Sequence, residues 1–302
     1  MATAHLTEGG TPTKSVPELA CSRSIASAIQ QHAYYTSTFH ILLSITTFLG
    51  NSLILVALHK ESSLHPPSKL FYRCLATTDL LVGLAVHPLA AIHWMSYSYE
   101  HWSLCRWTYH ATVISVSALC SVSLLTMAAI SVDRLLALLL GLTYRQIVTV
   151  KRVNVVLTTF WIATGVVPIV QSLDYHRTLW YGFVIIASCL IISFASYTKI
   201  FKALRHHHTQ IQDHAQQNLS QPNALNNARY RKAVNSALWV QLALIACYLP
   251  CCIVVVLITF NKLSLRSSAV SGALAMLLIS FNSTLNPCLY CWKISEDRKS
   301  VV

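Results

Sequence analysis

Residues 107–134 read WTYHATVISVSALCSVSLLTMAAISVDR, and this stretch decides the fold class. No Asp, Glu, Lys or Arg occurs in it before Asp133, so as a helix it is long enough to cross a hydrocarbon core of about 30 Å, which takes about 20 residues. Other stretches have the same character. The predicted spans are 36–58, 70–93, 107–133, 153–172, 179–202, 231–259 and 268–291. The sequence therefore predicts an all-α membrane protein, a seven-transmembrane-helix bundle.

The composition also indicates a membrane protein. Of the 302 residues, 54% are apolar and 11% are charged, and the mean hydropathy is +0.52. A soluble domain carries about 25% charged residues. These values argue against soluble enzymes and disordered regulators. They also argue against a nucleic-acid partner, although the net charge of +12 alone would suggest one.

The positions of Lys and Arg predict how the chain is oriented. Sixteen of the 22 flank one side of the predicted spans and six flank the other. Because cationic loops resist translocation, the N-terminus should be outside and the C-terminus inside. We therefore expect a multi-pass plasma-membrane protein in contact with membrane lipids. Its predicted parts are an extracellular segment 1–35, a transmembrane domain 36–291 with a flexible polar loop 203–229, and a cytoplasmic tail 292–302 that begins with a short amphipathic helix.

Asp79 lies in the middle of the second predicted span. A charged side chain there costs about 2.5–3.5 kcal/mol on insertion scales, so Asp79 must face protein or water. Two interpretations stay open: an ionised carboxylate that binds Na⁺ with other oxygen ligands, or a protonated Asp that links helices by hydrogen bonds. Polar residues at comparable depth on other spans are Asn51, Ser123, Asn282, Ser283 and Asn286.

Further polar and helix-bending residues recur within the spans. Asp133 and Arg134 end the third span. A lone Arg at a helix end can be explained by its side chain extending to the membrane interface, but this does not explain the Asp beside it. A proline inside a helix removes a backbone hydrogen bond and can bend the helix. Such prolines are Pro88, Pro168, Pro250 and Pro287.

Taken in order, these features resemble the rhodopsin-like (class A) family of G-protein-coupled receptors, over about residues 36–300. Each span carries one matching motif. They are Gly50-Asn51, Leu75-Ala76-Thr77-Thr78-Asp79, Asp133-Arg134, Trp161 with Pro168, Tyr197, Cys247-Tyr248-Leu249-Pro250 and Asn286-Pro287-Cys288-Leu289-Tyr290. The resemblance implies a receptor for an extracellular ligand with a heterotrimeric G protein as its partner.

The resemblance also implies a switch in which the inner end of the sixth helix swings outward and Arg134 turns toward the G protein. Many family members pair this Arg with an acid on the sixth helix, where this chain has Tyr230. We therefore expect ligand-independent signalling. The residues assigned to the switch are Asp133, Arg134, Tyr144, Tyr197, Tyr248, Pro250, Asn286, Pro287 and Tyr290.

Departures from the family pattern indicate a branch. Tyr109 stands where many members carry a disulfide-forming Cys, and Cys189 stands where most have a fifth-helix proline. Together with the internal loop at residues 144–153, this is similar to the melanocortin, cannabinoid and adenosine receptor branch. Cys21 and Cys105 are candidates for a replacement disulfide, but two free thiols fit the sequence equally well, because spacing alone does not show that their Cα atoms approach.

The resemblance places the ligand between the outer halves of the helices. Val116 replaces the Asp of amine receptors, Ser280 the retinal-linking Lys, and Val255 the Asn of adenosine receptors. The expected lining is apolar or mildly polar, which suits a neutral, largely apolar small molecule or lipid. Its candidate residues are Val116, Ser117, Cys120, Tyr181, Tyr248, Cys251, Cys252, Val255, Met276 and Ser280.

Two alternatives remain. A melanocortin-like peptide would be the ligand if the branch resemblance extends to the pocket. A seven-span transporter or channel would need several ionisable residues along a pathway, whereas Asp79 is essentially the one deep acid. We find no nucleophile–base pairing that would indicate an enzyme, and no cofactor is expected apart from an allosteric Na⁺ at Asp79.

Overall fold

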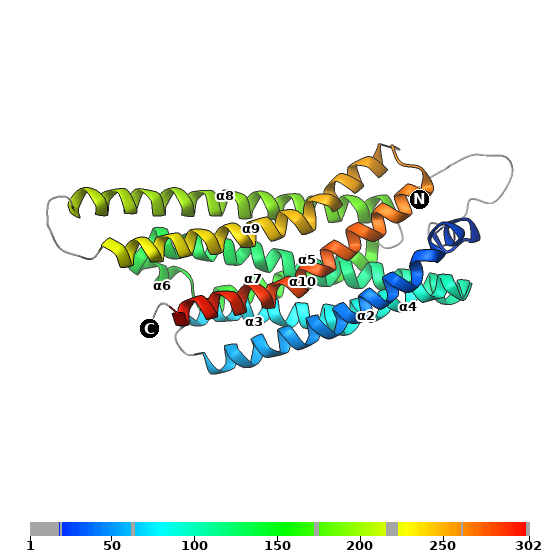
Figure 1. Ribbon diagram of the computed structural model, residues 1–302, viewed down its shortest axis with the longest axis horizontal. Coiled ribbons are helices and arrows are strands. Elements are labelled where there is room, and N and C mark those ends of the chain that lie inside the picture. Colours follow the sequence, from blue (N-terminus) through cyan, green and yellow to red (C-terminus); the bar gives the residue numbers. More distant parts are fainter. Residues whose placement is uncertain are drawn as a thin grey trace.

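The computed structural model describes residues 18, 20–61, 64–171, 175–215, 223–260 and 262–299. Within these residues every regular element is helical (Figure 1). The elements are α2 (Arg23–Lys60), α3 (Pro66–Leu81), the π-helix η1 (Val82–Val86), α4 (His87–Ser98), α5 (Trp102–Leu140), the 3₁₀-helix η2 (Gly141–Thr143), α6 (Tyr144–Ile147), α7 (Val150–Gln171), α8 (Tyr175–Ala215), α9 (Asn223–Thr259) and α10 (Leu265–Lys299).

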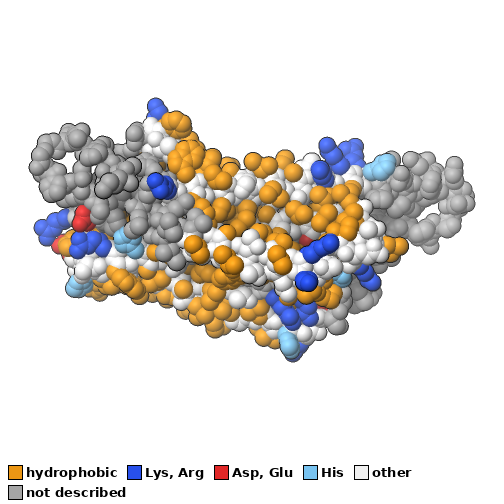
Figure 2. Space-filling model, turned by 180° about the vertical axis from the view of Figure 1, so that it is seen from behind, with side chains coloured by type: hydrophobic (Ala, Val, Ile, Leu, Met, Phe, Trp, Pro, Cys, Tyr) orange, Lys and Arg blue, Asp and Glu red, His pale blue; other side chains and the backbone are white. Residues whose placement is uncertain are grey.

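The long helices lie roughly side by side, and their surface is apolar across the middle. Figure 2 shows hydrophobic side chains covering the central band, with most Lys and Arg toward the two ends. Within the described part of the chain, six helical segments are long and apolar enough to cross a membrane, and α7, with 22 residues, covers the fourth predicted span as far as residue 171. The six segments are His32–Lys60, Pro66–Ser98, Trp102–Ile147, Arg177–Ala203, Trp239–Thr259 and Ser267–Pro287.

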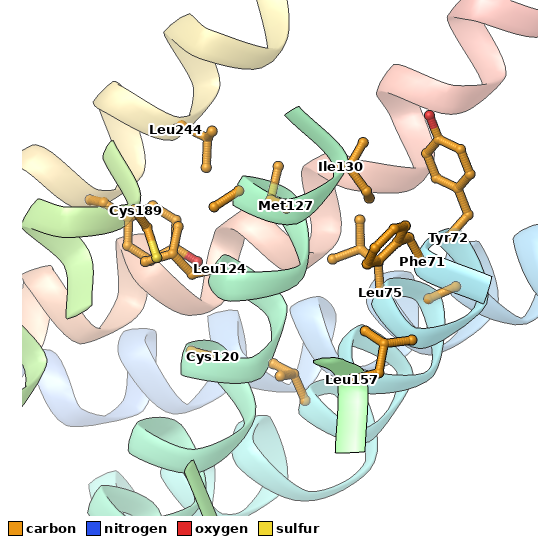
Figure 3. Packing of buried hydrophobic residues seen from close by; sticks show 14 of the residues in the cluster. Phe71, Tyr72, Leu75, Cys120, Leu124, Met127, Ile130, Leu157, Cys189 and Leu244 are labelled. Carbon is orange, nitrogen blue, oxygen red and sulfur yellow. The ribbon is translucent and has the colours of Figure 1, made fainter. Parts of the chain in front are cut away.

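The core lies where α3, α8 and α9 meet the central helix α5. In Figure 3, Phe71 and Leu75 of α3 point toward Ile130 of α5, and Leu124 of α5 lies near Leu244 of α9. Leu75, Leu124 and Leu244 are all buried. A buried ring of apolar side chains thus surrounds α5, which also carries Ser123 and Asp133.

Gly50 brings α2 into close contact with α10. A Cβ added at Gly50 would lie 2.9 Å from both Cβ and Cγ of Pro287, closer than carbon atoms pack. The missing side chain therefore allows the two helices to meet next to Asn51 and Asn286.

Replacing Gly50 with Ala should destabilise the protein by about 1–3 kcal/mol, the usual effect of adding atoms to a packed core. Gly182→Ala in α8 is the matched control, because nothing lies within 4 Å of its added Cβ. Thermal unfolding in detergent measures both variants. An unfolding temperature of Gly50→Ala equal to that of Gly182→Ala would contradict this close packing.

Several helices extend beyond their predicted limits. We predicted a flexible loop at 203–229, but α8 continues to Ala215 and α9 begins at Asn223; residues 216–222 lie outside the described part. The Gln- and His-rich composition suggested a loop, yet no Gly or Pro interrupts the chain from 203 to 221, and Gln is a good helix former. Likewise α2 begins at Arg23, within the segment 1–35 that we had placed outside the bundle.

The prediction of a separate amphipathic helix after the seventh span is wrong. Instead α10 runs unbroken to Lys299. The change from apolar to charged residues after the seventh span suggested a new element. However, no Gly or Pro occurs between Pro287 and residue 300, so nothing in the sequence ends the helix there.

Candidate functional site: two buried carboxylates on the helix bundle

The first carboxylate, Asp79 of α3, is fully buried and joins three helices. Ser123 Oγ of α5 donates to Asp79 Oδ1 at 2.9 Å. Asn286 Nδ2 of α10 donates to Asp79 Oδ2 at 2.6 Å. Both carboxylate oxygens thus accept a side-chain donor from another helix, which satisfies a polar group that would otherwise be expensive within a membrane.

Of the other predicted partners, Ser283 also forms a side-chain hydrogen bond with Asp79, whereas Asn51 and Asn282 contact other groups. Asn51 Nδ2 donates to the backbone carbonyls of Thr47 (2.9 Å) and Ser283 (3.1 Å), which links α2 to α10. Asn282 Nδ2 lies 3.5 Å from Met127 Sδ. Asn282 Oδ1 is buried and has no hydrogen-bond partner among the described residues.

These oxygens suit a small hard cation. Ions such as Na⁺ are held by carboxylate, hydroxyl and amide oxygens. Asp79 supplies a carboxylate, Ser123 a hydroxyl and Asn282 the buried oxygen that lacks a partner. The residues present therefore fit the Na⁺ site that the family resemblance implies.

The second carboxylate, Asp133 of α5, is almost fully buried. It lies ten residues after Ser123, toward the C-terminal end of α5. Tyr144 Oη of α6 donates to Asp133 Oδ1 at 2.5 Å, and Ser68 Oγ of α3 donates to Asp133 Oδ2 at 2.9 Å. Arg134 Nη2 lies 3.1 Å from the same Oδ2, and its guanidinium carbon is 5.7 Å from the centre of the Tyr72 ring. The neighbouring carboxylate and an aromatic ring thus hold Arg134.

The predicted pocket residues lie mostly in the packed interior. Tyr248 of α9 is 1% exposed, and it shares the main core cluster with Val116, Cys120 and Cys252. Val255 and Ser280 are buried as well, Ser117, Tyr181 and Cys251 are half-buried, and Met276 is exposed. One of these residues, Cys252, also lines a shallow apolar hollow together with Phe183, Ile253, Val256 and Leu257.

The comparison with known proteins agrees with this architecture. The family pattern described as "7 transmembrane receptor (rhodopsin family)" matches residues 50–179 and 168–290. The chain belongs to this family. The receptor is thus a multi-pass protein of the plasma membrane, and it is not an enzyme.

Individual relatives cover different parts of the receptor. It is 25% identical to the adenosine receptor A3 of Ovis aries over 288 residues, which span 87% of each chain. It is 30% identical to the histamine H2 receptor of Cavia porcellus over 131 residues, but these cover 42% of the receptor and 34% of the relative. With the alpha-2Db adrenergic receptor of Danio rerio it shares 28% identity over 159 residues, 49% of the receptor and 37% of the relative.

The other predicted switch residues are distributed along α8, α9 and α10. Tyr197 of α8 and Pro250 of α9 are half-buried, and Pro287 of α10 is buried. The side chain of Tyr290 lies outside the described part of the receptor.

Two contacts of the Asp133 network escaped the sequence reasoning. Ser68 donates to Asp133, and the Tyr72 ring lies next to Arg134. The available signal was their spacing, because residues four apart on a helix share a face, and both follow the helix-starting Pro66.

The structure also joins Cys21 to Cys105 in a disulfide, where the sequence left two alternatives open. Their Cα atoms are 5.9 Å apart and they are separated by 84 positions in the chain. The bridge ties the residues just before α2 to the beginning of α5.

Proposed function

We propose that the receptor binds an extracellular ligand and in response activates a heterotrimeric G protein, with its N-terminus outside and its C-terminus inside. The observation that carries this proposal is the Asp133 network. A buried carboxylate holds the adjacent Arg134 with help from Tyr144 and Ser68. An arginine paired with the neighbouring carboxylate can exchange that internal partner for a group on a protein bound at the inner face.

The central helix α5 connects this network to Asp79. Ser123 and Asp133 are ten residues apart on α5, or roughly 15 Å along the helix axis. A shift of α5 relative to α10 therefore strains the Ser123 and Asn286 bonds to Asp79 and moves Asp133. A bound Na⁺ would supply positive charge beside Asp79 and favour the packing in which those oxygens stay together.

The sixth span, within α9, is the proposed moving part. Pro250 lies inside α9 and leaves a backbone carbonyl without its usual helical donor, which makes local bending easier. Tyr248 is buried two residues before it, so a change of packing around the ligand is transmitted to this bend. Tyr197 and Tyr290 would fill the space that the inner end of α9 leaves when it moves.

The favoured ligand is a neutral, largely apolar small molecule or lipid. Histamine and adrenergic receptors are named after amines, but Val116 offers no counter-ion for one. The adenosine receptor match supports the melanocortin, cannabinoid and adenosine branch, yet Val255 offers no amide for a purine. The buried lining around Tyr248 is apolar or carries hydroxyl and thiol groups. A melanocortin-like peptide is the second candidate, supported by the internal loop at residues 144–153.

The proposal is tested by nucleotide exchange on a panel of purified Gα subunits, with the receptor in membranes and no ligand added. We expect nucleotide exchange above that of receptor-free membranes for at least one Gα class. Neutral lipids and Arg-containing peptides are then screened side by side, and we expect the neutral lipids to change this exchange rate further. Ion-flux recordings in the same cells test the transporter or channel alternative. Flux without exchange on any Gα subunit would overturn the proposal.

Tyr144→Phe should raise ligand-independent exchange about threefold or more. The change removes one hydrogen bond to the Asp133 carboxylate, and bonds to charged groups contribute about 1.5–3 kcal/mol, so the packing that holds Arg134 loses part of its advantage. Tyr35→Phe, at a tyrosine with 77% exposure, is the control. Equal exchange by both variants would contradict a restraining role of the Asp133 network.

A further inference from the structure

The beginning of α2 extends well past the membrane-spanning part of that helix. α2 has 38 residues, which corresponds to about 57 Å, whereas a hydrocarbon core is about 30 Å thick. The apolar span starts at His32. We call residues 20–33, at the outer end of the bundle, the outer strap.

The outer strap packs on the bundle with one apolar face. Ile25, Ile29 and Ala33 are four residues apart and Ala26 lies three residues before Ile29, so these side chains share a face of the helix. All four are at most 4% exposed. Ile25, Ala26 and Ile29 precede the apolar span, so their burial means that the strap is folded onto the receptor and is not a free extension.

Three helices receive this face at their outer ends. Tyr97 of α4 and Cys105 of α5 are buried in the contact, and Tyr97 Oη donates to the carbonyl of Ala20 at 3.3 Å. The partly buried residues that complete the surface are Trp94 of α4, Trp102 and Tyr109 of α5, and Ala269 of α10. The strap is therefore packed against α4, α5 and α10 together.

A covalent link fixes the strap in place. The Cys21–Cys105 disulfide joins it to α5. Arg23 Nη2 also lies 3.0 Å from Glu100 Oε2 just before α5, but this ion pair is exposed and such pairs contribute little. The disulfide and the apolar face are thus the main attachments.

Two of the helices under the strap carry the donors to Asp79. Ser123 lies on α5 and Asn286 on α10. The strap contacts α5 and α10 at their outer ends, and the Asp79 bonds involve the same pair deeper in the bundle. A movement of α5 against α10 must loosen both.

We propose that the outer strap is a built-in restraint that holds the receptor in the packing seen here, with Arg134 paired to Asp133, and that releasing the strap favours the signalling packing. The inference rests on the proposed G-protein function. Because the strap contacts belong to the restrained packing, losing them shifts the population toward the other one by their differential free energy. We expect ligand-independent signalling to increase about threefold or more.

The first test replaces both cysteines, Cys21→Ser with Cys105→Ser, and measures nucleotide exchange per receptor at the cell surface. A second variant, Ile25→Ala with Ile29→Ala, removes apolar contact and leaves the disulfide intact. Its matched control is Ile41→Ala with Ile45→Ala, which has the same spacing on the same helix, at residues that are 51% and 52% exposed. Both strap variants should signal more than this control. Signalling equal to the control in both would overturn the proposal.

A distance measurement separates the strap from the proposed function. Labels on unnatural amino acids at Leu104 of α5 and Val270 of α10, both exposed, report the separation of the two outer ends. In the strap variants the distance distribution should shift or broaden. One outcome is that the distance distribution shifts or broadens in the strap variants while neither these variants nor the unchanged receptor activates any Gα subunit. In that case the restraint is confirmed and the proposed G-protein function is wrong. If distances and exchange both match the control, the restraint is wrong.

Discussion

Asp79→Ala is expected to lower the free energy of unfolding by about 2–5 kcal/mol. Ser123 Oγ and Asn286 Nδ2 would lose their shared acceptor, and a buried donor without a partner costs about 1–3 kcal/mol. The fully buried position leaves water little access to replace the carboxylate. Thermal unfolding of the purified receptor in detergent measures the effect.

Asp79→Asn is the matched variant. An amide can accept from Asn286 Nδ2 with its oxygen and donate to Ser123 Oγ with its nitrogen, so both bonds are kept while the charge is lost. We expect nearly unchanged stability in the absence of Na⁺. Unfolding of Asp79→Asn as early as that of Asp79→Ala would show that the hydrogen bonds do not account for the loss.

A comparison of the unchanged receptor with Asp79→Asn decides between the two interpretations of Asp79. A ligand that binds only the folded state stabilises it in proportion to its concentration relative to its dissociation constant. Replacing Na⁺ by an organic cation at constant ionic strength should therefore lower the unfolding temperature of the receptor but not that of Asp79→Asn. An unfolding temperature of the receptor that does not respond to Na⁺ would leave Asp79 as a hydrogen-bonded link between α3, α5 and α10.

Arg134→Ala should reduce ligand-independent nucleotide exchange about tenfold or more. In the proposed function this guanidinium leaves Asp133 and donates to the G protein, and each hydrogen bond of a charged group contributes about 1.5–3 kcal/mol. A loss of 1.4 kcal/mol already corresponds to tenfold. Exchange on the Gα subunit that couples best, normalised to surface receptor, measures the effect.

Two variants accompany this measurement. Arg134→Lys keeps the charge but loses the planar pair of donors, so exchange should fall to an intermediate level. Arg145→Ala removes an exposed arginine on α6 and should leave exchange within about twofold. Equal exchange by the Arg134→Ala variant and the unchanged receptor would exclude Arg134 from coupling, whatever its role in the fold.

Much of the fold follows from apolar length and from polar residues that do not belong in lipid. Asp79 had to find partners, and Ser123 and Asn286 were among the few polar groups at its depth, so those contacts could be predicted. Helix ends could not be predicted so well, because composition and backbone preference point in different directions. Residues 203–215 are polar enough for a loop, yet nothing in them ends a helix, so α8 continues.

Contacts that depend on how the helices turn and pack against one another escaped prediction. Ser68 reaches Asp133 because α3 begins at Pro66 and turns this face inward, which hydropathy does not reveal. The disulfide depended on whether the strap folds back onto α5, and only the three-dimensional burial of Ile25 and Ile29 shows that it does. The interior around Tyr248 is similar: the residue types were predicted, but their close packing was not.

In the proposed function, the unexpected length of α9 would give its proline a mechanical role. In Figure 1 the first part of α9 lies beside α8 at the end of the bundle where α10 ends. From Pro250 back to Asn223 the helix measures roughly 40 Å. With Pro250 as a pivot, a tilt of roughly 10° would carry the tip of this lever arm by roughly 7 Å on that length. A small repacking around Tyr248 would thus be amplified into a displacement large enough to open or close a docking surface on the inner side.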